Sequence, residues 1–386
     1  RGAGASVAAS IAGKVDDLFA PGTDISGLSY KLRDDYTSLM WLGGTKALWD
    51  MGDGNQAAPL FYRYGNAART PQTRSKGFYW AGNASARAGN ATEANRYFEM
   101  AAQYPEYFYG QLALERLGRP LPQFKQVSLA SVNPQQAAAF NASPLAAAIR
   151  TIARTGIDWR TERYFFVALA ENAKDATELQ LAANLARELG LEELAVVVGR
   201  VAPEKGIEGF TRVGFPVIPT PPGTDFTIIH AIARQESEFD INRISHAGAR
   251  GVMQLMPGTA QEQAGKMGMS YMSASLMTDP QYNIRLGDGY FARMMDYYGG
   301  SYPLAVAAYN AGPGNVNKWL RANGDPRTGG IDWLRWVEQI PIFETKNYVH
   351  RVLENAVVYE ALNPERIRGG GRPRGVSQFL GKRTPG

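Results

Sequence analysis

Apolar residues recur at spacings of three and four along almost the whole chain, and this periodicity limits the fold more than any other feature. Strict alternation of apolar and polar residues, which half-buried strands require, is scarce, and dipeptides that form hairpin turns are few. The sequence therefore predicts an all-α fold built from many amphipathic helices.

A proline-rich stretch, GFPVIPTPPGTD at residues 214–225, interrupts the helical pattern. Its four prolines and two glycines cannot continue a helix, so we place a domain boundary there. A length of 386 residues favours two or three domains. We expect an α-superhelical domain over 1–130, a helical linker domain continuing it over 131–220, a different helical domain over 221–365, and a flexible basic tail over 366–386.

One helix pair near the N-terminus has small residues at its expected contact. Ala94, Phe98 and Ala101 follow a spacing of four and then three, and the preceding helix carries Phe78, Ala81 and Gly82 at matching offsets. Small residues at such positions let two helices approach closely, as in tetratricopeptide-type helix pairs. This pair predicts that the first domain is a degenerate α-superhelix.

Composition excludes several classes of site. The chain has no cysteine, which removes disulfides, thiolate metal sites and cysteine nucleophiles. Its three histidines lack metal-ligand spacing, and no P-loop or nucleophile-elbow motif occurs. We therefore expect no metal and no nucleotide cofactor.

The ends and the charge of the chain bear on partners and location. No apolar run reaches the roughly 18 residues of a membrane span, so we expect no transmembrane segment. The first residues lack both a methionine and the apolar core of a signal peptide, which suggests a trimmed chain. A net charge of +5 suits an anionic partner such as nucleic acid, a membrane surface or a cell-wall polymer with carboxylates.

Glu236 is the first candidate for chemistry. A helix is expected to start near Thr224 or Asp225, and the residues three, four and seven positions before Glu236 are all apolar. Glu236 should therefore lie on the buried face, whereas Glu238 should lie on a polar one. Two interpretations stay open: a structural glutamate paired with an arginine, or a desolvated acid with a raised pKa.

The next segment, SHAGARGVMQLMPGTA, is too rich in glycine for a core helix and too apolar for plain surface. Gly248 and Gly251 permit positive φ or close backbone approach. Gln254 offers a donor and an acceptor, which suits hydroxyl and acetamido groups. Of Met253 and Met256, we expect one in the core and one facing a groove, where it can pack on a sugar ring.

Two later segments add polar residues at helix ends. Tyr309 and Asn310 precede the helix-breaking sequence AGPG and are typical of groove-lining residues, although a tyrosine hydroxyl bonded to a backbone carbonyl is an equal alternative. Glu344 begins the last long helix, with Tyr348 four positions later. Favourable interaction with the helix dipole is a sufficient alternative explanation for Glu344.

The ordered phrases ARQES, GARGVMQLMPGTA, AAYNAGPGNV and IPIFETKNYV resemble the catalytic domain of soluble lytic transglycosylases, the lysozyme-like enzymes that cut peptidoglycan. The likeness is strong after about residue 225 and looser before it, where the family has a helical superhelix. It implies a periplasmic enzyme with Glu236 as catalytic acid. The resemblance also implies a set of substrate-binding residues, namely Ser245, Gln254, Met256, Tyr309, Glu344 and Tyr348. We add Asn310 to this set because of its position at a helix end.

The resemblance also implies a mechanism. Glu236 would protonate the glycosidic oxygen between MurNAc and GlcNAc and then, as a base, activate the C6 hydroxyl to close a 1,6-anhydro ring. Lys346 stands where the family often has arginine, which weakens any planar bidentate contact there.

Three other functions compete with this interpretation. A hydrolytic muramidase would have the same fold and use water in place of the C6 hydroxyl. A non-catalytic helical-repeat protein would bind glycan without cleaving it. A nucleic-acid-binding protein is suggested by the positive charge alone, and we do not expect nucleic acid as a partner. Protein partners of the superhelix are not predicted by any motif.

Overall fold

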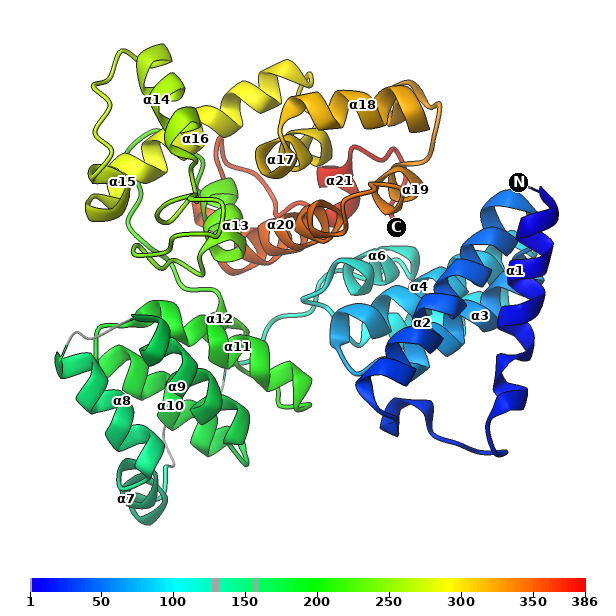
Figure 1. Ribbon diagram of the computed structural model, residues 1–386, viewed down its shortest axis with the longest axis horizontal. Helices are drawn as coiled ribbons and strands as arrows, with labels where there is room; N and C mark the ends of the chain where they lie inside the picture. Colours follow the sequence, from blue (N-terminus) through cyan, green and yellow to red (C-terminus); the bar gives the residue numbers. More distant parts are fainter. Residues whose placement is uncertain (1, 127–131, 156–158) are drawn as a thin grey trace. The chain divides into compact units, whose positions relative to one another are not determined.

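The computed structural model describes residues 2–126, 132–155 and 159–386. Within these ranges the chain forms helices joined by turns, with two isolated β-bridges near residue 250 and no strand (Figure 1). The predicted all-α class is confirmed.

The chain divides into two compact units. Unit 1 comprises residues 1–122 with 375–378 and 382–386, and unit 2 comprises 123–374 with 379–381. The boundary predicted between residues 130 and 131 lies outside the described residues. Residues 131–220 and 221–365 share unit 2, so a domain boundary between them stays a prediction.

Unit 1 is a series of helices that pack onto their neighbours in chain order (Figure 1, blue to cyan). Its helices are α1 (Gly2–Lys14), α2 (Tyr30–Thr45), α3 (Gly54–Ala67), α4 (Pro71–Arg87), α5 (Ala91–Ala102) and α6 (Phe108–Arg116).

Glycines set the spacing of helices in unit 1. A Cβ on Gly82 of α4 would lie 2.6 Å from the Phe98 ring of α5, so the close approach predicted for this pair is confirmed. A tighter contact was not predicted: a Cβ on Gly77 of α4 would lie 2.4 Å from the backbone nitrogen of Gly65 in α3. Only glycine permits two helix backbones to touch in this way.

The first half of unit 2 is a separate helical cluster with its own apolar core. Its helices are α7 (Pro134–Asn141), α8 (Pro144–Thr155), α9 (Trp159–Asn172), α10 (Ala176–Glu188), α11 (Ala195–Glu204) and α12 (Thr211–Gly214). The core draws on the apolar faces of α8 to α11, including Ile149, Phe166, Leu179 and Val198.

The second half of unit 2 holds the candidate site. Its helices are α13 (Phe226–Glu236), α14 (Pro257–Lys266), α15 (Ser275–Thr278), α16 (Pro280–Tyr297), α17 (Tyr302–Ala311), α18 (Pro313–Asn323), α19 (Trp333–Glu338) and α20 (Phe343–Leu362). Asp225 caps α13 by accepting the Ile228 N–H at 3.1 Å, as the predicted helix start requires. Helix α20 packs against both α13 and α17 (Figure 1, orange-red, green and yellow-orange), and α17 is buried from Pro303 to Tyr309.

Residues 366–386, predicted to be a flexible basic tail, make several specific contacts in the structure, and their flexibility stays a prediction. Residues Val376–Leu380 form the short helix α21, and Val376, Phe379 and Leu380 are buried. Arg374 donates to the buried Glu360 carboxylate at 2.5 Å, and the Phe379 ring lies 5.2 Å from that of Tyr302.

Candidate active site

Glu236 is the last residue of α13 and is half-buried. Burial is the main cause that raises the pKa of its carboxyl from 4.5 to about 8. The negative charge of Glu344 raises this pKa further, whereas Tyr348 and Arg243 lower it. A carboxylate at a helix C-terminus is also opposed by the helix dipole. Glu236 is thus a carboxylic acid that holds its proton near neutral pH.

The chain reverses direction immediately after Glu236, and this turn fixes the end of α13. Glu238 and Phe239 have positive φ values of 53° and 69°, which non-glycine residues rarely adopt. The Ser237 hydroxyl is buried and donates to the Val252 carbonyl at 2.8 Å, which ties the turn to the glycine-rich loop. Backbone strain of this kind persists only where the surroundings enforce it.

The side chain of Glu238 has different surroundings from that of Glu236, as predicted, but the cause is not the predicted one. It lies beyond the helix end, so its direction follows from the turn and not from helical register. Its carboxylate forms an ion pair with Arg163 of α9. Pairing with an arginine, which was one interpretation of Glu236, is thus found at Glu238.

The glycine-rich loop that follows the turn, residues 241–256, is held by its own backbone. Gly248 and Gly251 have φ values of 89° and 74°, as their predicted role requires. A Cβ on Gly251 would lie 2.2 Å from the Leu276 carbonyl oxygen, so this position accepts only glycine. The Ser245 hydroxyl accepts the Ala249 N–H at 3.0 Å, which leaves its own proton available to a ligand.

Asn283 of α16 anchors this loop and was missed by the sequence analysis. Its fully buried amide accepts the Met253 N–H at 2.8 Å and donates to the Arg250 carbonyl at 3.0 Å and the Leu276 carbonyl at 3.1 Å. An amide flanked by apolar neighbours on a helix was the available signal, because buried amides are normally fully hydrogen-bonded.

Gln254 and the two methionines occupy distinct positions in the loop. Gln254 has a positive φ of 47°, and its Nε2 donates to the carbonyls of Arg243 and Gly251 at 3.0 and 2.8 Å. Its donor capacity is therefore used within the loop, and Oε1 is the atom left to accept from a ligand. Met253 is fully buried, as expected for one of the two, whereas Met256 is 42% exposed, and its position in a groove stays a prediction.

Two buried tyrosines lie next to Glu236, since its charge contributes to raising the pKa of both, although burial is the main cause. The Tyr309 hydroxyl donates to the Met253 carbonyl at 2.8 Å, which is the backbone-bonded alternative for this residue. The Tyr348 hydroxyl interacts with Glu236, but the contact is looser than a full hydrogen bond, because no group in the described chain satisfies that hydroxyl geometrically.

The remaining predicted residues lie at the start of α20 and the end of α17. Glu344 is exposed in the first turn of α20, and its effect on Glu236 shows that the two carboxylates are close enough to interact. Asn310 accepts from the buried Thr345 hydroxyl at 2.7 Å, which joins α17 to α20. The structure thus gathers Glu236, Tyr309, Glu344 and Tyr348. Ser245 and Met256 lie on the glycine-rich loop, and in the described chain neither forms a hydrogen bond with Glu236.

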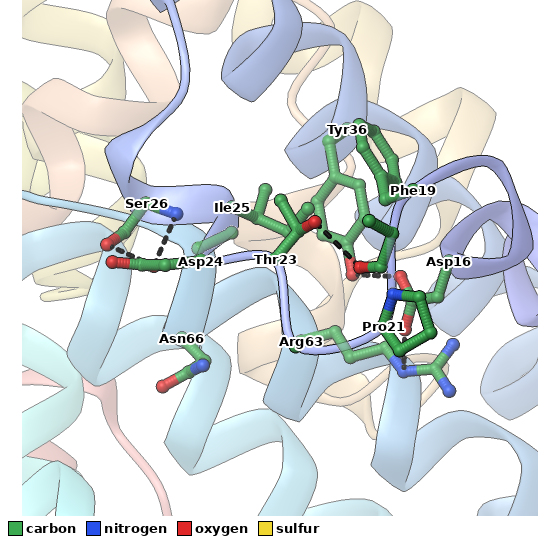
Figure 2. A pocket seen from close by; sticks show the side chains of 13 residues that line it. Asp16, Phe19, Pro21, Thr23, Asp24, Ile25, Ser26, Tyr36, Arg63 and Asn66 are labelled. Carbon is green, nitrogen blue, oxygen red and sulfur yellow. Dashed lines mark hydrogen bonds and ion pairs between the residues drawn. The ribbon is translucent and has the colours of Figure 1, made fainter.

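A separate pocket of about 260 Å³ lies within unit 1. Figure 2 shows its charged groups turned toward each other: Asp16 accepts from the Tyr36 hydroxyl at 2.7 Å and pairs with Arg63 at 3.2 Å. Asp24 is likewise bonded to Ser26. Because these polar groups satisfy one another, we assign no chemistry to this pocket.

No group of three or more histidine or acidic side chains in the described chain is arranged to hold a metal ion. None of the helices in the described ranges has the length and apolar character that crossing a bilayer requires.

A protonated glutamate at a helix end, beside a strained glycine-rich loop and two buried tyrosines, defines an acid–base site in an all-α domain. Residues 220–329 match the family model described as the transglycosylase SLT domain. The chain therefore carries an SLT domain, and the family resemblance noted from its motifs is confirmed.

Related proteins extend the likeness beyond this domain. The soluble lytic murein transglycosylase of Salmonella typhimurium is 29% identical over 88% of this chain and 52% of its own length. That of Escherichia coli is 40% identical over 130 residues, 33% of this chain and 20% of its own length. The chain thus spans at most about half of these relatives.

Solved structures give the same picture. An inactive glutamate-to-glutamine mutant of lytic transglycosylase Slt from Pseudomonas aeruginosa has a TM-score of 0.68 and 26% identity, covering 96% of this chain and 58% of that one. The 70-kDa soluble lytic transglycosylase from Escherichia coli has a TM-score of 0.65 and 25% identity, covering 96% of this chain and 64% of that one.

Proposed function

We propose that this chain is a peptidoglycan lytic transglycosylase that cleaves the β-1,4 bond between MurNAc and GlcNAc and leaves a 1,6-anhydroMurNAc end. The proposal includes a periplasmic location, where such a substrate is found. The observation that carries it is the pKa of about 8 at Glu236, inside a domain that matches the SLT family.

One carboxyl group with this pKa can serve as both acid and base. Protonated Glu236 gives its proton to the glycosidic oxygen as the bond to C1 breaks, and the resulting carboxylate accepts the proton of the sugar's own C6 hydroxyl. The C6 oxygen then bonds to C1 and closes the anhydro ring. The proton lost in the first step is recovered in the second, so no water is consumed.

The neighbouring groups support the carboxylate that forms between these steps. The raised pKa of Tyr348 keeps its hydroxyl protonated, so the hydroxyl can donate to the newly ionised Glu236. Tyr309 acts mainly by holding Met253 and thereby the loop, since its proton is already donated there. A buried donor aimed at a developing charge acts strongly because little water competes for it.

The loop residues are assigned to sugar binding. Ser245 has a free hydroxyl proton, Gln254 has a free carbonyl oxygen, and Met256 has exposed thioether surface suited to the apolar face of a pyranose. Asn310 and Glu344 complete the proposed contacts from α17 and α20.

A hydrolytic muramidase is the second candidate, and Glu344 is the observation that favours it. A second carboxylate that interacts with the catalytic acid is what a water-activating mechanism needs. Glu344 is exposed in the first turn of α20, where its charge complements the helix dipole, so we assign it to substrate binding.

Mass spectrometry of muropeptides released from purified sacculi tests the proposal. We expect products lighter by one water than the corresponding reducing sugars, released about 10³-fold more slowly by Glu236→Gln. Products with reducing ends would establish the hydrolase instead. Absence of any release by the intact chain would contradict both candidates.

A further inference from the structure

The whole positive charge excess of the chain resides in its last 21 residues. Residues 366–386 contain six arginines and lysines and no acidic residue, so residues 1–365 hold 35 basic against 36 acidic residues. Such segregation calls for a physical explanation, because surface charges are normally interspersed.

The first part of this segment is a closed loop and not a free tail. We call residues 364–373 the basic loop. It leaves α20 at Asn363, whose N–H donates to Tyr359 at 3.0 Å, and returns at Arg374, whose N–H donates to Glu360 at 2.8 Å. Glu360 is completely buried and also receives the Arg374 guanidinium and the Thr227 hydroxyl. Both ends are thus fixed within one turn of α20.

Between these anchors the loop presents its arginines to solvent. Arg366, Arg368 and Arg372 are exposed, and no ion pair satisfies any of them in the described chain. Arg374 is the arginine used for structure. Glu365 offsets one charge, so the loop itself carries a net charge of +2.

The basic loop lies at the opposite end of α13 from Glu236. The Arg366 guanidinium stands 5.1 Å from the ring of Phe226, the first residue of α13, whereas Glu236 is the last. At 1.5 Å per residue, roughly 15 Å of helix separates them. The loop is therefore too far from the acid to touch the bond being cut.

We propose that the basic loop is a second contact site of the chain for an anionic polymer, namely the peptide carboxylates of peptidoglycan. This inference rests on the proposed function for the identity of the polymer. Arginine binds carboxylates with two parallel hydrogen bonds, and three exposed arginines on a fixed loop match carboxylates repeated along a strand. The contact holds the strand while Glu236 acts about one helix length away.

Two other anionic partners fit the loop less well. Membrane-binding segments combine basic residues with a broad apolar face, but Ile367 is the one large apolar residue of the loop. Nucleic-acid sites combine basic residues with aromatic side chains for stacking, and residues 364–373 contain none.

Co-sedimentation with purified sacculi tests this proposal in a Glu236→Gln background, so that the polymer stays intact. The triple change Arg366→Gln, Arg368→Gln and Arg372→Gln should weaken retention about tenfold at low salt, and raised salt should abolish the difference. Sacculi whose carboxyl groups have been converted to amides should retain the unchanged loop as weakly as native sacculi retain the triple variant. The matched control removes three exposed charges elsewhere by Arg87→Gln, Arg154→Gln and Lys174→Gln, and should bind normally.

Equal retention of both triple variants would overturn the proposal, as would insensitivity to amidation. Stronger loop-dependent binding to phosphatidylglycerol vesicles or to DNA than to sacculi would assign the loop to another partner and also overturn it. Failure of the proposed activity is recognised separately, because it appears as absence of anhydro products from the intact chain whether or not the sacculi are bound.

Discussion

Unit 1 and the second half of unit 2 are both helical, but they use buried space differently. In unit 1 the closest helix contacts are made by glycines against backbone and rings, as at Gly65, Gly77 and Gly82. Around Glu236 the buried groups include Ser237, Asn283 and two tyrosines, and non-glycine residues adopt positive φ. In unit 1 close packing of helices stabilises the fold. In the second half of unit 2, strained backbone and buried polar groups hold the side chain of Glu236 in position.

The largest expected effect separates two neighbouring glutamates. Glu236→Gln removes the proton donor and should lower the rate of muropeptide release by about 10³-fold, within the range for general acid–base catalysis. Glu238→Gln only disturbs the ion pair with Arg163 and should change the rate by a few-fold at most. Equal losses in the two variants would remove the distinction on which the site assignment depends.

A second effect concerns the anchor of the glycine-rich loop. Asn283→Ala leaves the Met253 N–H and the Leu276 carbonyl without their partner and removes one of two hydrogen bonds to the Arg250 carbonyl. It should lower the free energy of unfolding by about 3 kcal/mol, with an activity loss of roughly tenfold or more. Gln180→Ala, at a buried amide of α10, should leave the activity of the folded protein unchanged. Chemical denaturation and initial rates measure both. Unimpaired activity of folded Asn283→Ala would show that the loop does not need this anchor.

A substitution at a close helix contact in unit 1 should lower the stability of the protein without changing its catalytic rate. A methyl group at Gly77→Ala would overlap the backbone of Gly65 and should destabilise unit 1 by about 2–3 kcal/mol, with no change in rate on short glycan fragments. Gly13→Ala is the matched control, because a Cβ there meets nothing within 4 Å and alanine favours the helix. Thermal denaturation compares the two, and equal midpoints would contradict the close contact between α3 and α4.

The smallest effect is a pH dependence of stability. Below pH 4.5 the carboxyl of Glu236 is protonated in both folded and unfolded states, so it contributes nothing. Between pH 4.5 and about 8 only the folded state keeps the proton, so burial of this group lowers stability progressively as pH rises. Glu236→Gln should therefore be more stable than the unchanged protein by about 2 kcal/mol at pH 8, and equally stable near pH 4. A constant difference across this range would contradict the shifted pKa.

The periodicity of the sequence was enough to predict the helices and to place Glu236 on the same helix face as three apolar residues. The sequence also predicted that one of Met253 and Met256 lies in the core, and it predicted the glycine contact at Gly82. These features depend on local spacing and on residue size, which the sequence states directly.

Other features depend on contacts between distant segments and were not predictable in this way. Asn283 lies 30 residues from the Met253 N–H that it accepts, and Arg163 lies in another helix from Glu238. Glu238 and Gln254 adopt positive φ although neither is a glycine, so the residue type gave no sign of this backbone conformation. The ion pair between Glu360 and Arg374 joins residues 14 positions apart, and composition gave no sign that they are partners.

Titration of the Glu236 carboxyl by carbon NMR, with carboxyl-labelled glutamate and Glu236→Gln to assign the signal, measures whether this group keeps its proton at neutral pH. We expect a midpoint at about pH 8, far above the 4.5 of an ordinary glutamate. A midpoint near 4.5 would mean that the group is ionised at neutral pH and has no proton to give to a glycosidic oxygen.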